Sequence, residues 1–360
     1  MNMFVGSRGP LQLLFGILVL VLSTGSNLVL ADVKRTASGK PDLSGVYDTG
    51  TLTPLNRPEE FGEHKFMTRE QADQVVQRTL AAFEFANRES DPDRGAPKKG
   101  GDGNNTAGAG NVGGYNAFWI DPGSEANEVD GKFRTSIVYD PPNGRQPQRT
   151  RASLAKMAKQ YKSFSYDNDG TASWLAYKGP GPFDGPESLA PSERCLISFS
   201  STVPSLPSLY NNYKRIVQTE THVMILQEMV HDARVIRLDS EFGPQANRKW
   251  LGDSIGYWEG DTLVVHSRNF KATSGLPGAD ENLEVVERFN LREDGNLVYD
   301  FTVTDPTAWT APWSGEYTWS ASPDKVYEYA CHEGNYAMGG ILRGARILEK
   351  EWTGPVAGEE

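Results

Sequence analysis

The chain has 360 residues, and its 36 Lys and Arg against 47 Asp and Glu give a formal net charge of −11. An acidic chain with no cluster of basic residues argues against nucleic acid and against anionic lipid as partners. We therefore expect the partner to be a small molecule or a neutral polymer, and the oligomeric state stays open. The length suits one large β-rich domain or two smaller ones.

Residues 1–31 have the pattern of a signal peptide. Arg8 precedes the apolar run 11–22, and residues 29–31 place small side chains at a cleavage site. The apolar run is too short to span a bilayer as a helix. Because Asp32, and not a cysteine, follows the expected cut, a lipid anchor is not expected there. The sequence predicts a periplasmic or secreted protein with no membrane span after signal cleavage.

The next 178 residues or so, 32–209, are predicted to form an irregular N-terminal region that wraps around a barrel. Residues 42–47 predict a first strand. Thr68 and Gln71 fit a capping box, and apolar residues recur at helical spacing, so a helix is predicted over 68–87. A strand at 135–139 and a helical patch at 153–161 follow, before Gly-, Pro- and Ser-rich residues that end near 209.

The Gly- and Asn-rich residues 91–114 contain the letters GxGxxG at 108–113. A dinucleotide site needs a strand before these glycines and a helix after them. Here no strand precedes them, and residues 115–120 predict a strand. No organic cofactor is therefore predicted.

Residues 210–349 are predicted to be an antiparallel β-barrel domain. Tight turns at 259–261 and 293–295 join strand-like runs that alternate apolar and polar side chains. The predicted strands are 215–218, 222–229, 233–238, 254–258, 262–267, 283–291, 296–304, 314–320 and 326–330. A meander of this length favours a mainly β, lipocalin-like up-and-down barrel, with one or two helices and long loops from the N-terminal half. Such a barrel has room for one small ligand.

Both faces of the predicted strand 283–291 carry charge. Glu284 and Arg288 share one face, whereas Glu287 lies on the other. Either one face is solvated and the other lines a polar cavity, or the strand lies at an exposed edge. The sequence leaves open which strand faces line the cavity.

Nine sequence words, in this order, resemble a large family of exported bacterial proteins. They are PDLSGVYD (41–48), YNAFWIDPG (115–123), RTSIVYDPPNGR (134–145), ERC (193–195), EMVHDARVI (228–236), WLGDSIGYWEGDTLVVHSRNF (250–270), ENLEVVERF (281–289), TDPTAWTAPW (304–313) and YEYACHEGNY (327–336). Tyr47 stands where the family pattern often has Trp. The resemblance covers nearly the whole chain after residue 31, but it implies no activity.

Cys195 and Cys331 are the two cysteines of the chain. In an oxidising compartment such a pair more often forms a disulfide than a metal site or a nucleophile. The predicted bridge ties the irregular middle of the chain to its C-terminal segment.

The first candidate catalytic group lies at one hairpin end. His231 with Asp232 could move protons near neutral pH, and Arg234 could stabilise a developing anion, with Glu228 close by. The alternative is that a His-Asp pair in a turn only caps backbone groups.

The second candidate group is in YEYACHEGNY, where Glu328, His332, Glu333 and Asn335 surround Cys331. The disulfide would hold them rigidly, which suits a catalytic site and equally suits a structural clasp.

Together the two groups offer a metal-ligand set, which we treat as a minority alternative. His231, Asp232, His332 and Glu333 could bind zinc, manganese or iron. No spacing such as HExxH supports it, so the sequence predicts no metal.

Candidate substrate-binding residues are mostly aromatic, because aromatic faces can stack on apolar ligands or sugars. They are Tyr210, Asn212, Arg288, Trp258, Trp309 and Tyr336. The alternative is that the aromatic residues belong to the core, as alternation in Tyr317 and Trp319 and again in Tyr327 and Tyr329 indicates.

The leading hypothesis is an exported enzyme that acts on a small hydrophobic or aromatic molecule by cofactor-free acid-base chemistry, of the lyase, isomerase or hydratase type. One alternative is a periplasmic lipocalin-like protein that binds a hydrophobic ligand. A second is a carbohydrate-active enzyme, which would need an exposed cleft lined by Trp and paired carboxylates.

Overall fold

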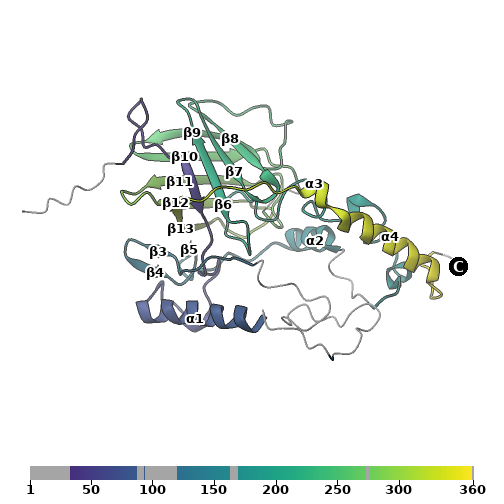
Figure 1. Ribbon diagram of the computed structural model, residues 1–360. Coiled ribbons are helices and arrows are strands. Elements are labelled where there is room, and N and C mark those ends of the chain that lie inside the picture. The colour runs from purple at the N-terminus through teal and green to yellow at the C-terminus, as the bar shows by residue number, and fades with distance from the viewer. Residues whose placement is uncertain (1–32, 87–92, 94–119, 163–168, 273–275, 359–360) are drawn as a thin grey trace, which may run out of the picture. The chain divides into compact units, whose positions relative to one another are not determined.

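The structure is a computed structural model that describes residues 33–86, 93, 120–162, 169–272 and 276–358 (Figure 1). The predicted signal peptide, the GxGxxG letters and nearly all of the predicted strand 115–120 lie outside the described residues. Within the described ranges, no helix has both the length and the apolar character needed to cross a bilayer.

Nine strands close into a barrel, and their order around the ring follows the order in the sequence. The ring closes where β1 pairs with the end of β13, and one further strand, β5, extends the sheet beside the start of β13. The strands are β1 (Gly45–Asp48), β5 (Val138–Asp140), β6 (Tyr213–Gln218), β7 (His222–Gln227), β8 (Ala233–Leu238), β9 (Asp253–Glu259), β10 (Thr262–Arg268), β11 (Glu284–Leu291), β12 (Leu297–Thr304) and β13 (Trp313–Ser322). The prediction of a mainly β barrel is confirmed.

The prediction that every neighbouring pair is antiparallel is wrong at one place. β8 and β9 pair in parallel, with Ile236 beside Ser254. A parallel pair needs a long connection, because the chain must return to the starting end before the second strand begins. Residues 239–252 provide that connection, and Arg237 and Asp253 at its two ends form an ion pair of 2.8 Å.

The predicted limits of the barrel domain, 210–349, also need correction. β1 is an N-terminal strand that completes the ring, and β13 ends at Ser322. Residues 326–330 do not form the predicted strand. They lead into two helices, α3 (Cys331–Gly334) and α4 (Tyr336–Glu351). The Asn335 side chain caps α4 by accepting a hydrogen bond from the backbone N–H of Met338.

In its described part, the N-terminal region holds two further α-helices and a small sheet. Helix α1 (Arg69–Ala86) confirms the predicted helix, and its capping box forms as expected, with Thr68 and Gln71 each donating a backbone N–H to the other's side chain. Helix α2 (Arg151–Gln160) confirms the helical patch. The strands β2 (Phe66–Met67), β4 (Lys132–Arg134) and β3 (Glu128–Val129) form the small sheet, and Met67 and Ala72 pack together between it and α1. Figure 1 shows α1 beside β3 and β4.

The inside of the barrel is filled by aromatic side chains. The rings of Phe289 and Tyr299 lie 5.0 Å apart, and those of Tyr299 and Trp319 lie 4.7 Å apart. Tyr317 and Trp319 share the buried face of β13, as their alternation predicts, whereas Tyr327 is exposed. These rings occupy the space where a lipocalin-like barrel would hold its ligand, so a site must be sought elsewhere.

Candidate functional site

The hairpin end between β7 and β8 is a short 3-10 turn, η6 (Met229–His231). Val230 and His231 both have left-handed backbones, with φ of 61° and 47°. The exposed His231 donates from Nδ1 to the carbonyl oxygen of Tyr329 at 3.2 Å, whereas the Asp232 carboxylate accepts the backbone N–H of Ser198 at 3.0 Å. The two members of the predicted catalytic pair therefore have different partners.

Burial alters the two carboxyl groups of this turn. It raises the pKa of Asp232, although hydrogen bonds from Ser201 and Ser198 lower it in part. Burial likewise raises the pKa of Glu228, which lies almost wholly inside the protein. Each group is therefore easier to protonate than an exposed carboxyl.

Arg234 does not point toward His231 but into the barrel. Its guanidinium forms a two-point ion pair with the fully buried Glu287, at 2.5 and 2.9 Å, and the Tyr299 hydroxyl donates to the same carboxylate at 2.7 Å. Because the Arg234 guanidinium is already paired with the Glu287 carboxylate, the structure does not support its predicted role in stabilising an anion of the substrate.

Lys214 completes this interior group. It is buried, donates to the side chain of Gln227, and has a pKa lowered to about 7 by burial and by the charge of Arg234. The sequence analysis missed Lys214, Glu287 and Tyr299 as a unit. The signal was the charge on both faces of strand β11, since Glu287 faces inward and Arg288 outward.

The predicted disulfide is present in the structure. Cys195 and Cys331 are bonded, with their Cα atoms 5.8 Å apart, and Asn335 donates to the carbonyl oxygen of Glu193 at 2.7 Å beside the bridge. His332 and Glu333 of this segment are exposed on α3. The clasp interpretation of YEYACHEGNY accounts for these contacts.

The proposed metal-ligand set does not assemble. Throughout the described part of the chain, no three His, Cys, Asp or Glu side chains come together in a way that could hold a metal ion. The contact of His231 with the second group is a hydrogen bond to the backbone carbonyl of Tyr329. Asp232 points to the serines of residues 198–201 instead.

Five of the six candidate substrate-binding residues line none of the pockets found among the described residues. The Tyr210 ring packs against Phe199, the buried Asn212 side chain bonds Ser208 and the carbonyl oxygen of Asp121, and Arg288 lies 3.8 Å from Glu259 on the outer surface. Trp258 packs against the barrel core, and Tyr336 is 84% exposed on α4. Trp309 is the exception, because it lines a pocket.

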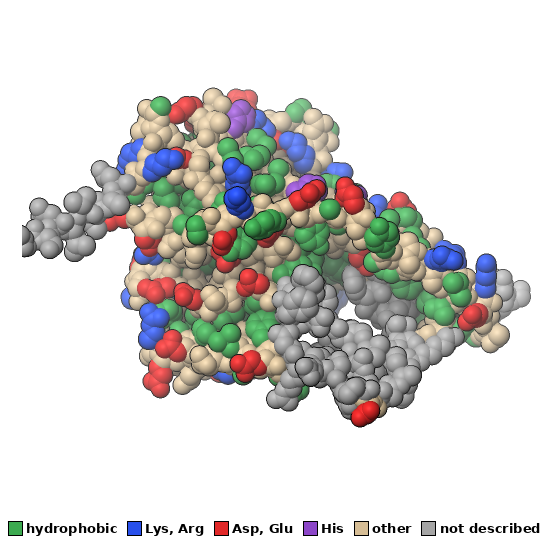
Figure 2. All heavy atoms as spheres, viewed as in Figure 1, with side chains coloured by type: hydrophobic (Ala, Val, Ile, Leu, Met, Phe, Trp, Pro, Cys, Tyr) green, Lys and Arg blue, Asp and Glu red, His purple; other side chains and the backbone are tan. Residues whose placement is uncertain are grey.

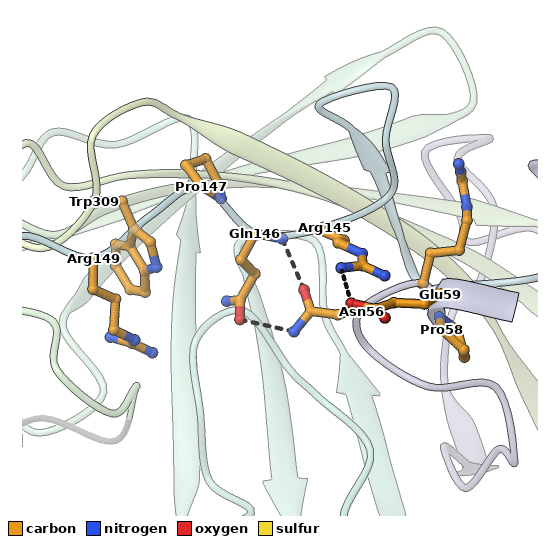
Figure 3. A pocket seen from close by; sticks show the side chains of 9 residues that line it. Asn56, Pro58, Glu59, Arg145, Gln146, Pro147, Arg149 and Trp309 are labelled. Atoms are coloured by element: carbon orange, nitrogen blue, oxygen red, sulfur yellow. Dashed lines mark hydrogen bonds and ion pairs between the residues drawn. The ribbon is translucent and has the colours of Figure 1, made fainter. Parts of the chain in front are cut away.

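This pocket, which we call the arginine pocket, has a volume of about 480 Å³ and is lined by Asn56, Arg57, Pro58, Glu59, Arg145, Gln146, Pro147, Arg149 and Trp309. Figure 3 shows Trp309 and Arg149 at one end of it and Asn56, Arg145 and Glu59 at the other. Its lining carries three guanidinium groups and one carboxylate in a chain of net charge −11. On the face shown in Figure 2, by contrast, acidic and basic side chains are interspersed.

A tight turn positions the first guanidinium. In the turn of residues 141–144, Gly144 donates to the carbonyl oxygen of Pro141 at 2.9 Å and has φ of +69°, a backbone conformation that favours glycine. A Cβ atom on Gly144 would lie 2.6 Å from an Nη atom of Arg57. The glycine is therefore also what lets the Arg57 guanidinium pack against the turn.

Arg57 is buried and hydrogen-bonded to neutral oxygens. Its Nε donates to the Thr135 hydroxyl at 3.1 Å, and its Nη1 donates to the carbonyl oxygen of Pro142 at 3.2 Å. Burial lowers the pKa of Arg57, and the neighbouring charge of Glu63 opposes that effect. Among the described residues, no carboxylate is bonded to this guanidinium.

Arg149 and Trp309 form the other end of the pocket. The Arg149 guanidinium lies 4.8 Å from the centre of the Trp309 ring and donates to the carbonyl oxygen of Pro277 at 2.7 Å. A short antiparallel bridge joins the backbones of Arg149 and Trp309, so the stacked pair is fixed at both ends. Burial lowers the pKa of Arg149.

Asn56 and Arg145 connect the two loops that form the wall of the pocket. The backbone N–H of Gln146 donates to the Asn56 side chain at 2.7 Å, and the Arg57 N–H donates to the carbonyl oxygen of Gly144 at 2.8 Å. Arg145 lies 3.5 Å from Glu59 in an exposed ion pair. The pocket is therefore held by backbone contacts before any ligand arrives.

A scan against models of known protein families finds no match for this chain, and a search among curated proteins finds none either. The family resemblance carried by the nine sequence words accordingly stays a prediction.

Proposed function

We propose that this is an exported protein that binds a small molecule through an anionic group, most simply a carboxylate, in the arginine pocket. The observation that carries the proposal is that Arg57 and Arg149 donate to neutral oxygens, and within the described residues neither is ion-paired with a carboxylate. Arg57 is buried and Arg149 is partly buried. A cation that is removed from water without a counterion is costly, and a bound anion offsets that cost.

The chemistry of the lining supports this class of ligand. The guanidinium group is planar and presents parallel N–H donors that match a carboxylate at two points. The volume of about 480 Å³ lies within the range of small-molecule sites and suits neither a polymer nor a long lipid. The pocket replaces the barrel interior as the binding site, since aromatic rings fill that interior.

The first test is titration calorimetry of the purified protein with a panel of small carboxylates, such as citrate, gluconate and benzoate. Arg149→Gln removes one charged donor and is expected to weaken binding roughly 10- to 100-fold, because a hydrogen bond to a charged group contributes about 1.5–3 kcal/mol. Arg288→Gln is the matched control, since Arg288 is an arginine on the outer barrel surface paired with Glu259.

Two results would contradict the proposal. One is equal affinity of the wild type and Arg149→Gln for the carboxylate that binds. The other is that native mass spectrometry of protein purified from its own compartment shows a bound molecule, which proves to be neutral when denaturation releases it for identification. A released carboxylate supports the proposal and names the ligand.

A second candidate function is the acid-base enzyme, with the hairpin end as its site. It is favoured by the position of Glu228 and Asp232 on either side of His231 in the sequence, because burial raises the pKa of both carboxyl groups and so favours the protonated form that a general acid needs. In a screen of lyase and isomerase substrates, His231→Ala should abolish any turnover found with the wild type. Turnover that persists in His231→Ala and in His332→Ala would refute this function.

A further inference from the structure

Helix α2 borders a second cavity, of about 670 Å³, which we call the α2 cavity. Part of its lining is apolar, with Pro180, Leu189 and Pro191 on the loop side. The Leu189 side chain is buried, so this wall belongs to the packed interior and does not come from a mobile surface group. The arginine pocket, by comparison, is lined chiefly by polar and charged groups.

The rest of the α2 cavity carries positive charge. Lys156, Lys159, Lys162 and Arg194 line it, and Glu187 is its acidic lining residue. Glu187 lies 3.9 Å from Arg194, and Lys156 lies 3.1 Å from Asp280. Lys162 donates to the carbonyl oxygen of Pro180. The lining thus carries four cations and one carboxylate, although Lys156 and Arg194 each have an acidic neighbour.

The wall that carries Arg194 is rigid. Arg194 donates its backbone N–H to the carbonyl oxygen of Ala190 at 3.2 Å, and Glu193 accepts the backbone N–H of Ala190 at 2.8 Å. The next residue is Cys195, which the disulfide fixes to Cys331. A site held by covalent and backbone contacts needs little ordering when a ligand binds.

We propose that the α2 cavity binds an amphiphilic anion, with an aromatic or short aliphatic body against Leu189 and the prolines and a carboxylate or sulfonate against the lysines. The volume suits a small molecule of this kind. An apolar wall contributes by removing apolar surface from water, and the cations select the charged end. This site is separate from the arginine pocket and does not rest on the function proposed for it.

The test uses two fluorescent probes with the same rings, 1-anilinonaphthalene-8-sulfonate and the uncharged N-phenyl-1-naphthylamine. The wild type should bind the sulfonate with one-to-one stoichiometry and more tightly than the neutral probe, and octanoate should displace it. The double variant Lys159→Glu/Lys162→Glu should weaken sulfonate binding at least tenfold, which corresponds to about 1.4 kcal/mol. Lys159→Gln is a milder second variant, expected to weaken it about threefold by removing one charge.

Two controls locate the probe. Lys325→Glu reverses an exposed lysine that does not line the cavity and should leave binding unchanged. Arg145→Gln, in the arginine pocket, should leave it unchanged as well. Equal binding of both probes, or full binding by the double variant, would overturn the inference. Loss of binding in Arg145→Gln alone would overturn it too, by placing the probe in the arginine pocket, and would leave the proposed function standing.

Discussion

The ion pair inside the barrel gives the sharpest stability prediction. Glu287→Gln keeps the shape of the side chain but removes the negative charge that is paired with Arg234, and the positive charge of Lys214 lies close to both. Glu287 is 0% exposed and Arg234 is 7% exposed, so water cannot replace the lost carboxylate. Breaking a buried pair in this way typically costs about 3–5 kcal/mol of stability, and we expect a loss of that size.

The assay is urea unfolding at neutral pH, followed by circular dichroism, with the disulfide intact. Arg288→Gln is the control on the same strand, because Arg288 is the next residue, faces outward and makes a surface pair whose loss should cost under about 1 kcal/mol. The double variant Arg234→Met/Glu287→Leu should be more stable than Glu287→Gln, since it leaves neither member of the pair charged. A loss below about 1 kcal/mol for Glu287→Gln would refute the reasoning, because that is the size expected of an exposed pair.

Three further predictions concern single features. The pKa of Lys214 is lowered to about 7 in the folded protein, so above that pH the unfolded chain binds more protons than the folded one. The free energy of unfolding should therefore rise by roughly 2 kcal/mol from pH 7 to pH 9, relative to that of Lys214→Met. Urea unfolding at each pH measures this difference. Gly144→Ala should destabilise the protein by about 1–3 kcal/mol and weaken carboxylate binding in calorimetry. The reasons are that alanine is strained at this positive φ and that its Cβ atom would clash with the Arg57 guanidinium. Cys195→Ser/Cys331→Ser should lower the free energy of unfolding by about 2–5 kcal/mol in the same denaturation assay, and no change would show that the bridge does not constrain the unfolded chain.

The strands were predictable because their signal is local. The turns at Gly260 and Gly295 have φ of 60° and 85°, as their glycines indicate, and the alternation along β11 to β13 places the expected side chains inside. The parallel pair β8–β9 was not predictable, because strand alternation is the same in both directions. The alternation of Tyr327 and Tyr329 predicted a strand at 326–330, which does not form, and Tyr327 is exposed. The helices α3 and α4 after Ala330 were not predicted.

The hairpin end shows why residue types alone did not identify a site. A His-Asp pair in a turn has the same sequence whether it serves catalysis or caps a backbone, and only the partners decide. Here His231 bonds the Tyr329 carbonyl, and Asp232 bonds the Ser198 backbone. Arg234 was placed with them by its sequence position, yet it lies two residues after Asp232 on a strand, where its side chain faces the barrel interior and Glu287.

The arginine pocket could not be predicted from the sequence for a different reason. Its residues are brought together only by tertiary contacts. Arg57 and Arg149 are 92 positions apart in the sequence. The first is placed by the contact of residue 57 with the turn at Gly144, and the second by the bridge between its backbone and Trp309. Net charge is no guide to such a site, because the free energy of a bound anion depends on the few charges within several ångströms and not on the sum over the chain. An acidic protein can therefore hold a cationic pocket, and the acidic composition that argues against nucleic acid leaves a small carboxylate fully compatible with the fold.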